Sequence, residues 1–303
     1  MDDQNGLGGP RFLRSGSTSQ GLLLTLLGDY WFGATVHIPS AALVELLGEF
    51  GITDDAARAA LSRVQRTGWV EGHKQGRHTA YRLSDEAARQ AERRGRQILT
   101  FSAETADTEP RWDRKWNLVS YSLSADRAED RRRIRRRLRL QGYAPLQDAL
   151  WIRPWGSAER VADALAPWPE ARVRVFCGAE LVEGERVDSV AAWGLDKLAA
   201  HYDELVVRFD AVAERWGNAP DPAAALVART RTMEAWAPMR WTDPRLPSEL
   251  LPEPWPGWEA RRAFAGVYDS LGPAAVQRVR EVVARHSERA AEQVRYDTVA
   301  EPR

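Results

Sequence analysis

The hydrophobic pattern is clearest between residues 53 and 83. One helical face between Thr53 and Gly68 is formed by four apolar positions, Ala57, Ala60, Leu61 and Val64. Thr53 is suited to cap the start of this helix, and Gly68 follows its end. Two short segments with strand character then flank Gly76. The stretch therefore predicts a helix followed by a short hairpin.

Two further helices are predicted upstream, over Ser17–Gly28 and Ser40–Leu47, with Pro39 at the first helical position of the second. A fourth helix, Asp85–Leu99, follows the hairpin. Two helices, a third exposed helix and a hairpin form the order of a winged helix-turn-helix. We expect this domain over residues 17–101, after a disordered Gly- and Ser-rich tail at 1–16.

A polar linker is expected at residues 102–110. Beyond it, strand and helix signals alternate as β-α-β(β)-α-β, which predicts a ferredoxin-like middle domain over residues 111–190. Residues 191–303 have mainly helical patterns, at 195–216, 222–236 and in two closing helices after a Pro- and Trp-rich insert. The expected fold class is α+β, with a winged helix, a ferredoxin-like domain and a helical C-terminal domain.

The charge is unevenly distributed, although the net charge of the chain is zero. Residues 53–100 hold ten Lys and Arg against six Asp and Glu, and residues 111–160 hold thirteen against six. Residues 161–303 hold eighteen against twenty-three. A basic N-terminal part is compatible with a nucleic-acid partner, which the neutral total alone disfavours.

The exposed face of the predicted helix between Thr53 and Gly68 carries small and hydrogen-bonding side chains. Arginine can pair with guanine, and Ser or Gln can reach other base edges in the major groove. The hairpin tip can contact phosphates or enter the minor groove. The DNA-facing residues expected from this pattern are Arg58, Ser62, Arg63, Gln65 and Arg66 on the helix, and His73, Lys74, Arg77 and His78 on the hairpin. The alternatives are an ordinary solvated helix and a winged helix that binds protein.

An arginine run at 130–140 contains Ile134 and Leu138, four residues apart, which predicts a buried stripe with arginines on the other faces. Such a run is usually a solvated face or a set of partners for acidic groups, although direct DNA contact is the alternative. Several of the thirteen tryptophans fall near the middle domain, where they form a core or line a pocket for a flat ligand.

No catalytic motif stands in a suitable context. The chain has no HExxH, no cysteine pair and no GxSxG, P-loop or GxGxxG in the right setting. We therefore expect no enzyme activity, no catalytic or metal-binding residue and no cofactor. The single cysteine, the lack of a membrane-spanning apolar run and the lack of a secretory signal indicate a cytoplasmic protein.

Three blocks of the chain together resemble the PaaX family of bacterial transcriptional regulators, the phenylacetic-acid degradation repressors. They read ARAALSRVQRTGWVEGHKQGRHTAYRLS at 57–84, WDRKWNLVSYSLSADRAEDRRRIRRRLRLQGYAPLQDALWIRPW at 112–155, and LPSELLPEPWPGWEARRAFAGVY at 246–268. The resemblance implies a homodimeric repressor that binds double-stranded operator DNA. It also adds Tyr81 to the expected DNA-binding residues. The resemblance also implies a small-molecule effector, phenylacetyl-coenzyme A or another aryl or acyl thioester. It does not indicate which residues form the effector pocket.

The ferredoxin-like unit also resembles a small CRISPR-associated nuclease, in which an Asp at the end of the first strand holds a metal. Here the first strand ends Tyr121-Ser122-Leu123-Ser124, and Asp126 falls at a helix start. The missing carboxylate disfavours a metal-dependent nuclease. We expect instead a ligand-responsive repressor of an aromatic-acid, phenylacetate-type operon.

Overall fold

The computed structural model describes residues 18–76, 78–105, 108, 111–147, 149–180, 190–216 and 220–300 of the chain. The tail expected at 1–16 lies outside the described residues. The chain forms two compact units: the first comprises residues 1–103, 205–240 and 259–303, and the second comprises 104–204 and 241–258. The first unit therefore combines the N-terminal region with most of the C-terminal helices.

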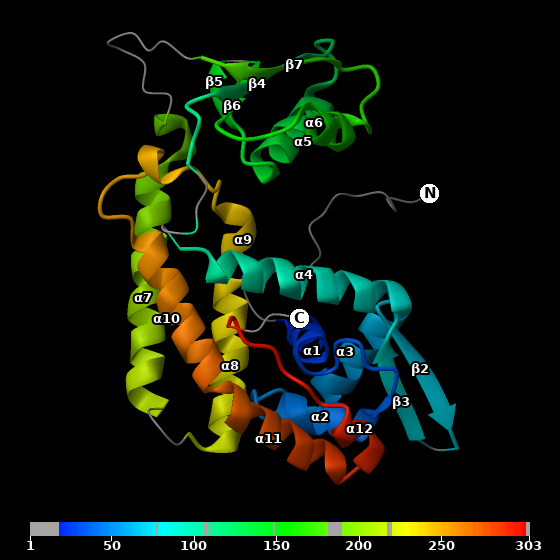
Figure 1. The fold of residues 1–303 in the computed structure, drawn as a ribbon. Helices are drawn as coiled ribbons and strands as arrows, with labels where there is room; N and C mark the ends of the chain where they lie inside the picture. The colour runs from blue at the N-terminus through cyan, green and yellow to red at the C-terminus, as the bar shows by residue number, and fades with distance from the viewer. Residues whose placement is uncertain are drawn as a thin grey trace. The chain divides into compact units, whose positions relative to one another are not determined.

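The N-terminal part of the first unit has the predicted winged-helix order (Figure 1). Its helices are α1 (Ser19–Tyr30), α2 (Ser40–Gly48), α3 (Asp54–Arg66) and α4 (Asp85–Ala103), and its strands are β1 (Ile38–Pro39), β2 (Val70–Gln75) and β3 (His78–Leu83). The three strands form an antiparallel sheet in the order β1-β3-β2. The predicted bounds of α3 and of the hairpin are confirmed.

Strand β1 is absent from the sequence-based prediction. Ile38 and Pro39 pair with Tyr81 and Ala80 of β3, so Pro39 is the residue before helix α2 and not its first helical residue. Two residues are too few to give a period-two pattern, and their strand character comes from the partner strand.

Helix α4 continues to Ala103, four residues beyond the expected end at Leu99. Phe101 is buried and its ring stacks on Trp236, with centroids 5.7 Å apart. Ser102 is also buried and accepts a 2.7 Å hydrogen bond from the indole of Trp236. Because these contacts come from a distant part of the chain, the local polar composition of residues 102–110 did not reveal them.

The second unit contains an antiparallel sheet in the order β5-β6-β4-β7. Its elements are β4 (Trp116–Ser122), α5 (Ala128–Leu140), β5 (Ala144–Gln147), β6 (Leu150–Arg153), α6 (Ala158–Leu165) and β7 (Arg172–Ala179). This connectivity and order are those of a ferredoxin-like fold, as predicted. The buried core joins β4 to the two helices through Val119, Tyr121, Ile134, Leu138, Trp151, Val161 and Leu165.

The remaining elements are mainly helical. They are α7 (Leu195–Trp216), α8 (Pro222–Trp236), α9 (Met239–Thr242), α10 (Pro256–Ser270), α11 (Gly272–Ala284) and α12 (Glu288–Glu292), with short 3-10 turns at Ala191–Trp193 and Ser248–Leu250. The expected bounds of α7 and α8 are confirmed. No helix in the described ranges combines the length and hydropathy that a membrane span requires.

Arg229 of α8 connects the C-terminal helices to the winged helix within the first unit. The side chain is fully buried, and its guanidinium lies 3.7 Å from the centroid of the Tyr268 ring. It donates hydrogen bonds to the carbonyls of Tyr268 (3.1 Å) and Asp297 (2.7 Å) and to the hydroxyl of Tyr30 in α1 (3.4 Å). A buried charge is tolerated only when it is well partnered, so these contacts hold three distant segments together.

The Pro- and Trp-rich insert packs within the second unit. Asp243 accepts a 2.5 Å hydrogen bond from the hydroxyl of Tyr202, and the ring of Trp255 meets that of Tyr202 edge to face at 5.7 Å. Arg245 forms an ion pair with Glu104. The insert therefore braces the start of α7 and the beginning of the middle region.

Candidate DNA-binding surface

Helix α3 is held by its apolar face, as its pattern predicts. Ala57, Ala60, Leu61 and Val64 are all buried against the helices that precede α3. The Thr53 hydroxyl accepts a 3.4 Å hydrogen bond from the amide of Ala56 and caps the helix. With one face fixed in the core, the opposite face of α3 must point to solvent.

The exposed face of α3 carries Arg58, Ser62, Arg63 and Arg66, all of which are solvent-accessible. The Arg58 guanidinium lies 3.6 Å from the carboxylate of Asp54 in an exposed pair, which holds it only weakly. Within the part of the chain that the structure describes, Arg63 and Arg66 form no ion pair. Their charges are therefore available to an external anion.

Gln65 differs from the arginines because it leans toward the hairpin. A Cβ placed on Gly72 would lie 2.6 Å from the Gln65 amide nitrogen and 3.2 Å from the ring of Tyr81. Gln65 and Tyr81 thus meet over Gly72, on the sheet face that also carries buried Val70 and Leu83. These contacts set the position of the hairpin, which is the wing, relative to α3.

The wing presents Lys74 near its tip, opposite Thr79, and Gly76 forms the turn with a φ of 61°. Lys74 is exposed and has no ion-pair partner among the described residues. Arg77 lies outside the described residues. At the base of the wing, Arg82 pairs with Glu71 at 2.7 Å and with Asp85 at 2.9 Å, which joins both strands to α4.

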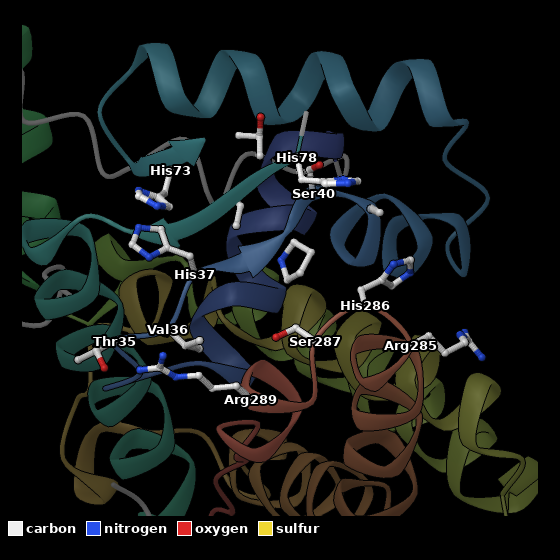
Figure 2. Close-up of a pocket in the computed structure, with 14 residues that line it drawn as sticks. Thr35, Val36, His37, Ser40, His73, His78, Arg285, His286, Ser287 and Arg289 are labelled. Carbon is white, nitrogen blue, oxygen red and sulfur yellow. The ribbon is translucent and has the colours of Figure 1, made fainter. Parts of the chain in front are cut away.

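His73 and His78 stand on the other face of the wing from Gln65. Side chains alternate across a strand, so His73 points away from the side on which Gly72 meets α3. Both histidines line a cavity of about 630 Å³, together with residues of the 35–41 segment and of the α11–α12 corner (Figure 2). The structure therefore places nine of the ten predicted residues, seven on α3 or on the wing face toward it and His73 and His78 at this cavity.

The cavity is basic. Four of the five histidines of the chain line it, His37, His73, His78 and His286, and so do Arg285 and Arg289. No Asp or Glu is among its described lining residues. The rings of His37 and His73 lie side by side, with centroids 5.3 Å apart.

Electrostatics within the cavity are set by a few neighbours. Partial burial lowers the pKa of His37, and the nearby positive charges of Arg82 and His73 lower it further. Glu45 of α2 contacts two of the cavity-lining residues, His286 and Arg285. Burial acts to raise the pKa of Glu45, but the hydrogen bonds and charges of His286 and Arg285 lower it overall. The imidazole of His286 is 2.9 Å from the Glu45 carboxylate.

His37, His286 and Arg289 were not among the predicted site residues. His37 reaches the wing through the pairing of β1 with β3, and His286 through the packing of α11 on α2. The four histidines are far apart in the sequence, and no local signal groups them.

The arginine-rich helix α5 is largely committed to partners inside its own unit. Ile134 and Leu138 are fully buried, which confirms the predicted stripe. Arg131 donates to the carbonyls of Ser124 and Ala125 at 2.6 and 2.9 Å, and Arg139 lies over the Trp151 ring at 5.4 Å. These contacts favour the structural interpretation of the run.

Three tryptophans of the second unit pack on one another. Trp112 meets Trp116 edge to face at 4.9 Å, and Trp116 stacks on Trp193 at 6.2 Å. Trp151 is buried in the ferredoxin-like core. The burial of Trp116 and Trp151 favours the core interpretation of these tryptophans.

The described residues contain no cluster of three His, Cys, Asp or Glu side chains that could hold a metal ion. Strand β4 spans Trp116–Ser122 and carries no carboxylate, so the nuclease-type metal ligand is missing at the position where the sequence comparison expects it. Cys177 is exposed on β7.

Family models match three consecutive parts of the chain. A model described as PaaX-like protein covers residues 18–87, the PaaX protein central Cas2-like domain covers 109–190, and the PaaX-like protein C-terminal domain covers 193–281. The chain belongs to the PaaX family. The resemblance seen in the sequence and the three-part α+β fold of the PaaX family are both confirmed.

Two similar proteins extend this result. The transcriptional repressor PaaX of Escherichia coli (strain K12) is 29% identical over 266 residues, which cover 84% of this chain and 78% of the repressor. The solved structure of the uncharacterized protein Rv0674 from Mycobacterium tuberculosis superposes with a TM-score of 0.52 at 20% identity, covering 85% of this chain and 97% of the other. The second likeness supports the fold alone.

Proposed function

We propose that this PaaX-family protein is a ligand-responsive transcriptional repressor that binds operator DNA through α3 and the wing. The observation that carries the proposal is the exposed face of α3, where Arg63 and Arg66 have no ion-pair partner within the described residues and lie beside the small side chains of Ala59 and Ser62. Small residues allow a helix to approach base edges in the major groove, and free arginines can pair with guanine.

The name of the Escherichia coli relative supports repression as the outcome of binding. In the proposed complex the protein is a homodimer, and two copies of α3 read two half-sites of a roughly palindromic operator. Lys74, together with Arg77, adds contacts to phosphates or the minor groove. A catalytic activity is not part of this proposal.

The effector is proposed to be an aryl or acyl thioester of coenzyme A, and the controlled genes a phenylacetate-type catabolic operon. Effector binding would release the DNA by favouring a dimer geometry that no longer fits the half-sites. A ligand shifts such an equilibrium only by its difference in affinity for the two geometries.

The decisive experiment compares two double variants of the intact protein in a gel-shift titration. Arg63→Ala with Arg66→Ala should weaken operator binding by about 2–6 kcal/mol, which corresponds to a loss of at least roughly 30-fold. Arg89→Ala with Arg96→Ala removes the same charge from α4, where both arginines pair with neighbouring glutamates, and should change affinity little. Equal losses in the two variants would contradict the assignment of α3.

The operator and the effector can be obtained together. Fragments of sheared genomic DNA are selected on the protein at moderate salt, and the selection is repeated with a panel of acyl-coenzyme A thioesters. An enriched palindrome that one thioester releases supports the proposal. Recovery of no enriched sequence would favour a winged helix that binds protein.

A further inference from the structure

The basic cavity beside the wing has the features of an anion site. Its described lining combines four imidazoles and two guanidiniums with the hydroxyls of Thr35, Ser40, Thr79 and Ser287, and contains no carboxylate. A volume of about 630 Å³ lies within the range of small-molecule sites. A metal is the other usual ligand of clustered histidines, but no three of the described His, Cys, Asp and Glu side chains are placed to share one.

We propose that this cavity binds a phosphate-bearing small molecule, whose anionic group is held by His37, His73 and Arg289. Arg289 forms no ion pair within the described ranges, whereas Arg285 and His286 are engaged with Glu45. His37, the residue before β1, and His73 of β2 have neighbouring rings. An anion between them would neutralise charges that otherwise repel.

Protonation should accompany binding. The pKa of His37 is lowered, because the imidazole is partly buried and lies near the positive charges of Arg82 and His73, while the nearby Glu71 acts in the opposite direction. A bound phosphate reverses this balance, since an opposite charge nearby favours the charged imidazole. Anion affinity should therefore rise as the pH falls, and binding should take up protons.

The cavity also connects two parts of the first unit. His73 and His78 belong to the wing strands, while Arg285, His286, Ser287 and Arg289 belong to the α11–α12 corner. A ligand held by both would fix the wing relative to the C-terminal helices. This consequence for DNA affinity rests on the proposed function, whereas binding of the anion does not.

The test is calorimetric titration of the full chain with inorganic pyrophosphate, without DNA. We expect binding at about pH 6 that weakens at least about tenfold by pH 8, because imidazoles, whose ordinary pKa is about 6.5, carry little charge at pH 8. Titrations in buffers of different ionisation enthalpy should show proton uptake. His37→Gln, His73→Gln and Arg289→Gln should each weaken binding about tenfold or more, as expected for loss of one charged hydrogen bond.

The matched controls are His201→Gln, which alters the one histidine outside the cavity, and Arg208→Gln, an exposed arginine of α7. Both should bind pyrophosphate like the unaltered protein. Thermal melting of each variant checks that it is folded. Absence of binding at the lower pH, or binding that the cavity variants leave unchanged, would overturn the proposal.

A DNA backbone could supply the same phosphate chemistry, and a short duplex of unrelated sequence separates the two sources. If the cavity binds a small molecule and not DNA, adding duplex should leave the pyrophosphate affinity unchanged or lower it only to a constant value. This is the behaviour of two coupled but distinct sites. If the apparent pyrophosphate affinity keeps falling as the duplex concentration rises, DNA and pyrophosphate compete for the same site. The DNA backbone is then the source of the phosphate, and the small-molecule assignment is wrong. The pyrophosphate titration does not depend on the α3 variants. If those variants bind operator DNA normally, the proposed function fails and the anion site can still be correct.

Discussion

Helices α3 and α5 both bury one apolar face and carry arginines on the others, but their arginines differ in how many contacts they make within the protein. Each buries one apolar stripe, through Leu61 in α3 and Leu138 in α5. In α5 most arginines already have partners: Arg132 and Arg133 lie 3.6 and 3.4 Å from Glu129, and others bind carbonyls or aromatic rings. In α3 the two C-terminal arginines have none within the described residues. The arginines of the denser run thus have more contacts within the protein than those of α3, so charge density in a sequence is a poor guide to a binding face.

The largest expected effect concerns what the two helices share. Leu61→Ala and Leu138→Ala should each destabilise their own unit by about 2–5 kcal/mol, because each leaves a cavity in a packed core. Hydrogen exchange followed by mass spectrometry can assign the loss to one unit. Val207→Ala, at a position 70% exposed, is the control and should cost little. A change of less than 1 kcal/mol, the order of an exposed site, at either leucine would contradict the description of the stripes.

The second largest effect depends on the contact between α3 and the wing. Among the described residues, helix α5 has no such hairpin contact. Gly72→Ala should displace the Gln65 amide and weaken operator binding by about 1–3 kcal/mol, the worth of one good base contact. Gln65→Ala should give the same loss, and the double variant no further loss. Gly266→Ala is the control, because a Cβ there meets nothing within 4 Å. Additive losses would show that the two residues act separately.

The salt dependence of DNA binding offers a direct way to break the comparison. Lys74→Ala should reduce the slope of log affinity against log salt by about 0.9, because Lys74 of the wing is proposed to contact a phosphate. Arg136→Ala is the strictest counterpart, because Arg136 is exposed in α5 and has no partner among the described residues. Its slope should equal that of the unaltered protein. A reduced slope would place α5 on the DNA as well.

The smallest effect tests how firmly α2 is tied to the C-terminal helices. The folded pKa of Glu45 is lowered, so its contribution to stability is present above the unfolded value of about 4.3 and is lost as the pH falls through the folded pKa. The pair is partly exposed, and the contribution should be below about 1 kcal/mol. Urea unfolding of the protein and of Glu45→Gln should differ at neutral pH and converge in acid. A constant difference would mean that the ion pair contributes nothing.

Much of the fold follows from local signals. Thr53, Gly68 and Gly76 set the bounds of α3 and of the wing, because a cap and residues with positive φ act on their immediate neighbours. The helix stripes of α3 and α5 were equally readable, since burial follows a 3.6-residue period. The ends of α7 and α8 were predicted for the same reasons.

The parts that could not be predicted depend on partners distant in the chain. Helix α4 extends because Trp236 covers Phe101 and Ser102, and β1 exists because β3 lies beside it. The histidine cavity needs residues from near positions 37, 75 and 286 to meet, which no spacing rule encodes. The DNA-facing assignments of α3 and the wing stay predictions until the variants above are measured.

The contacts of Arg229 have a consequence for the time at which the protein can act. Tyr30 belongs to the first helix and Asp297 lies near the end of the described chain, yet both bind the same guanidinium. Domains generally fold as units while the chain emerges from the ribosome. Here the first unit lacks its central buried contacts until the segment around Asp297 has been translated, so a nascent or truncated chain would carry the whole of α3 without the buried contacts that tie the first unit together.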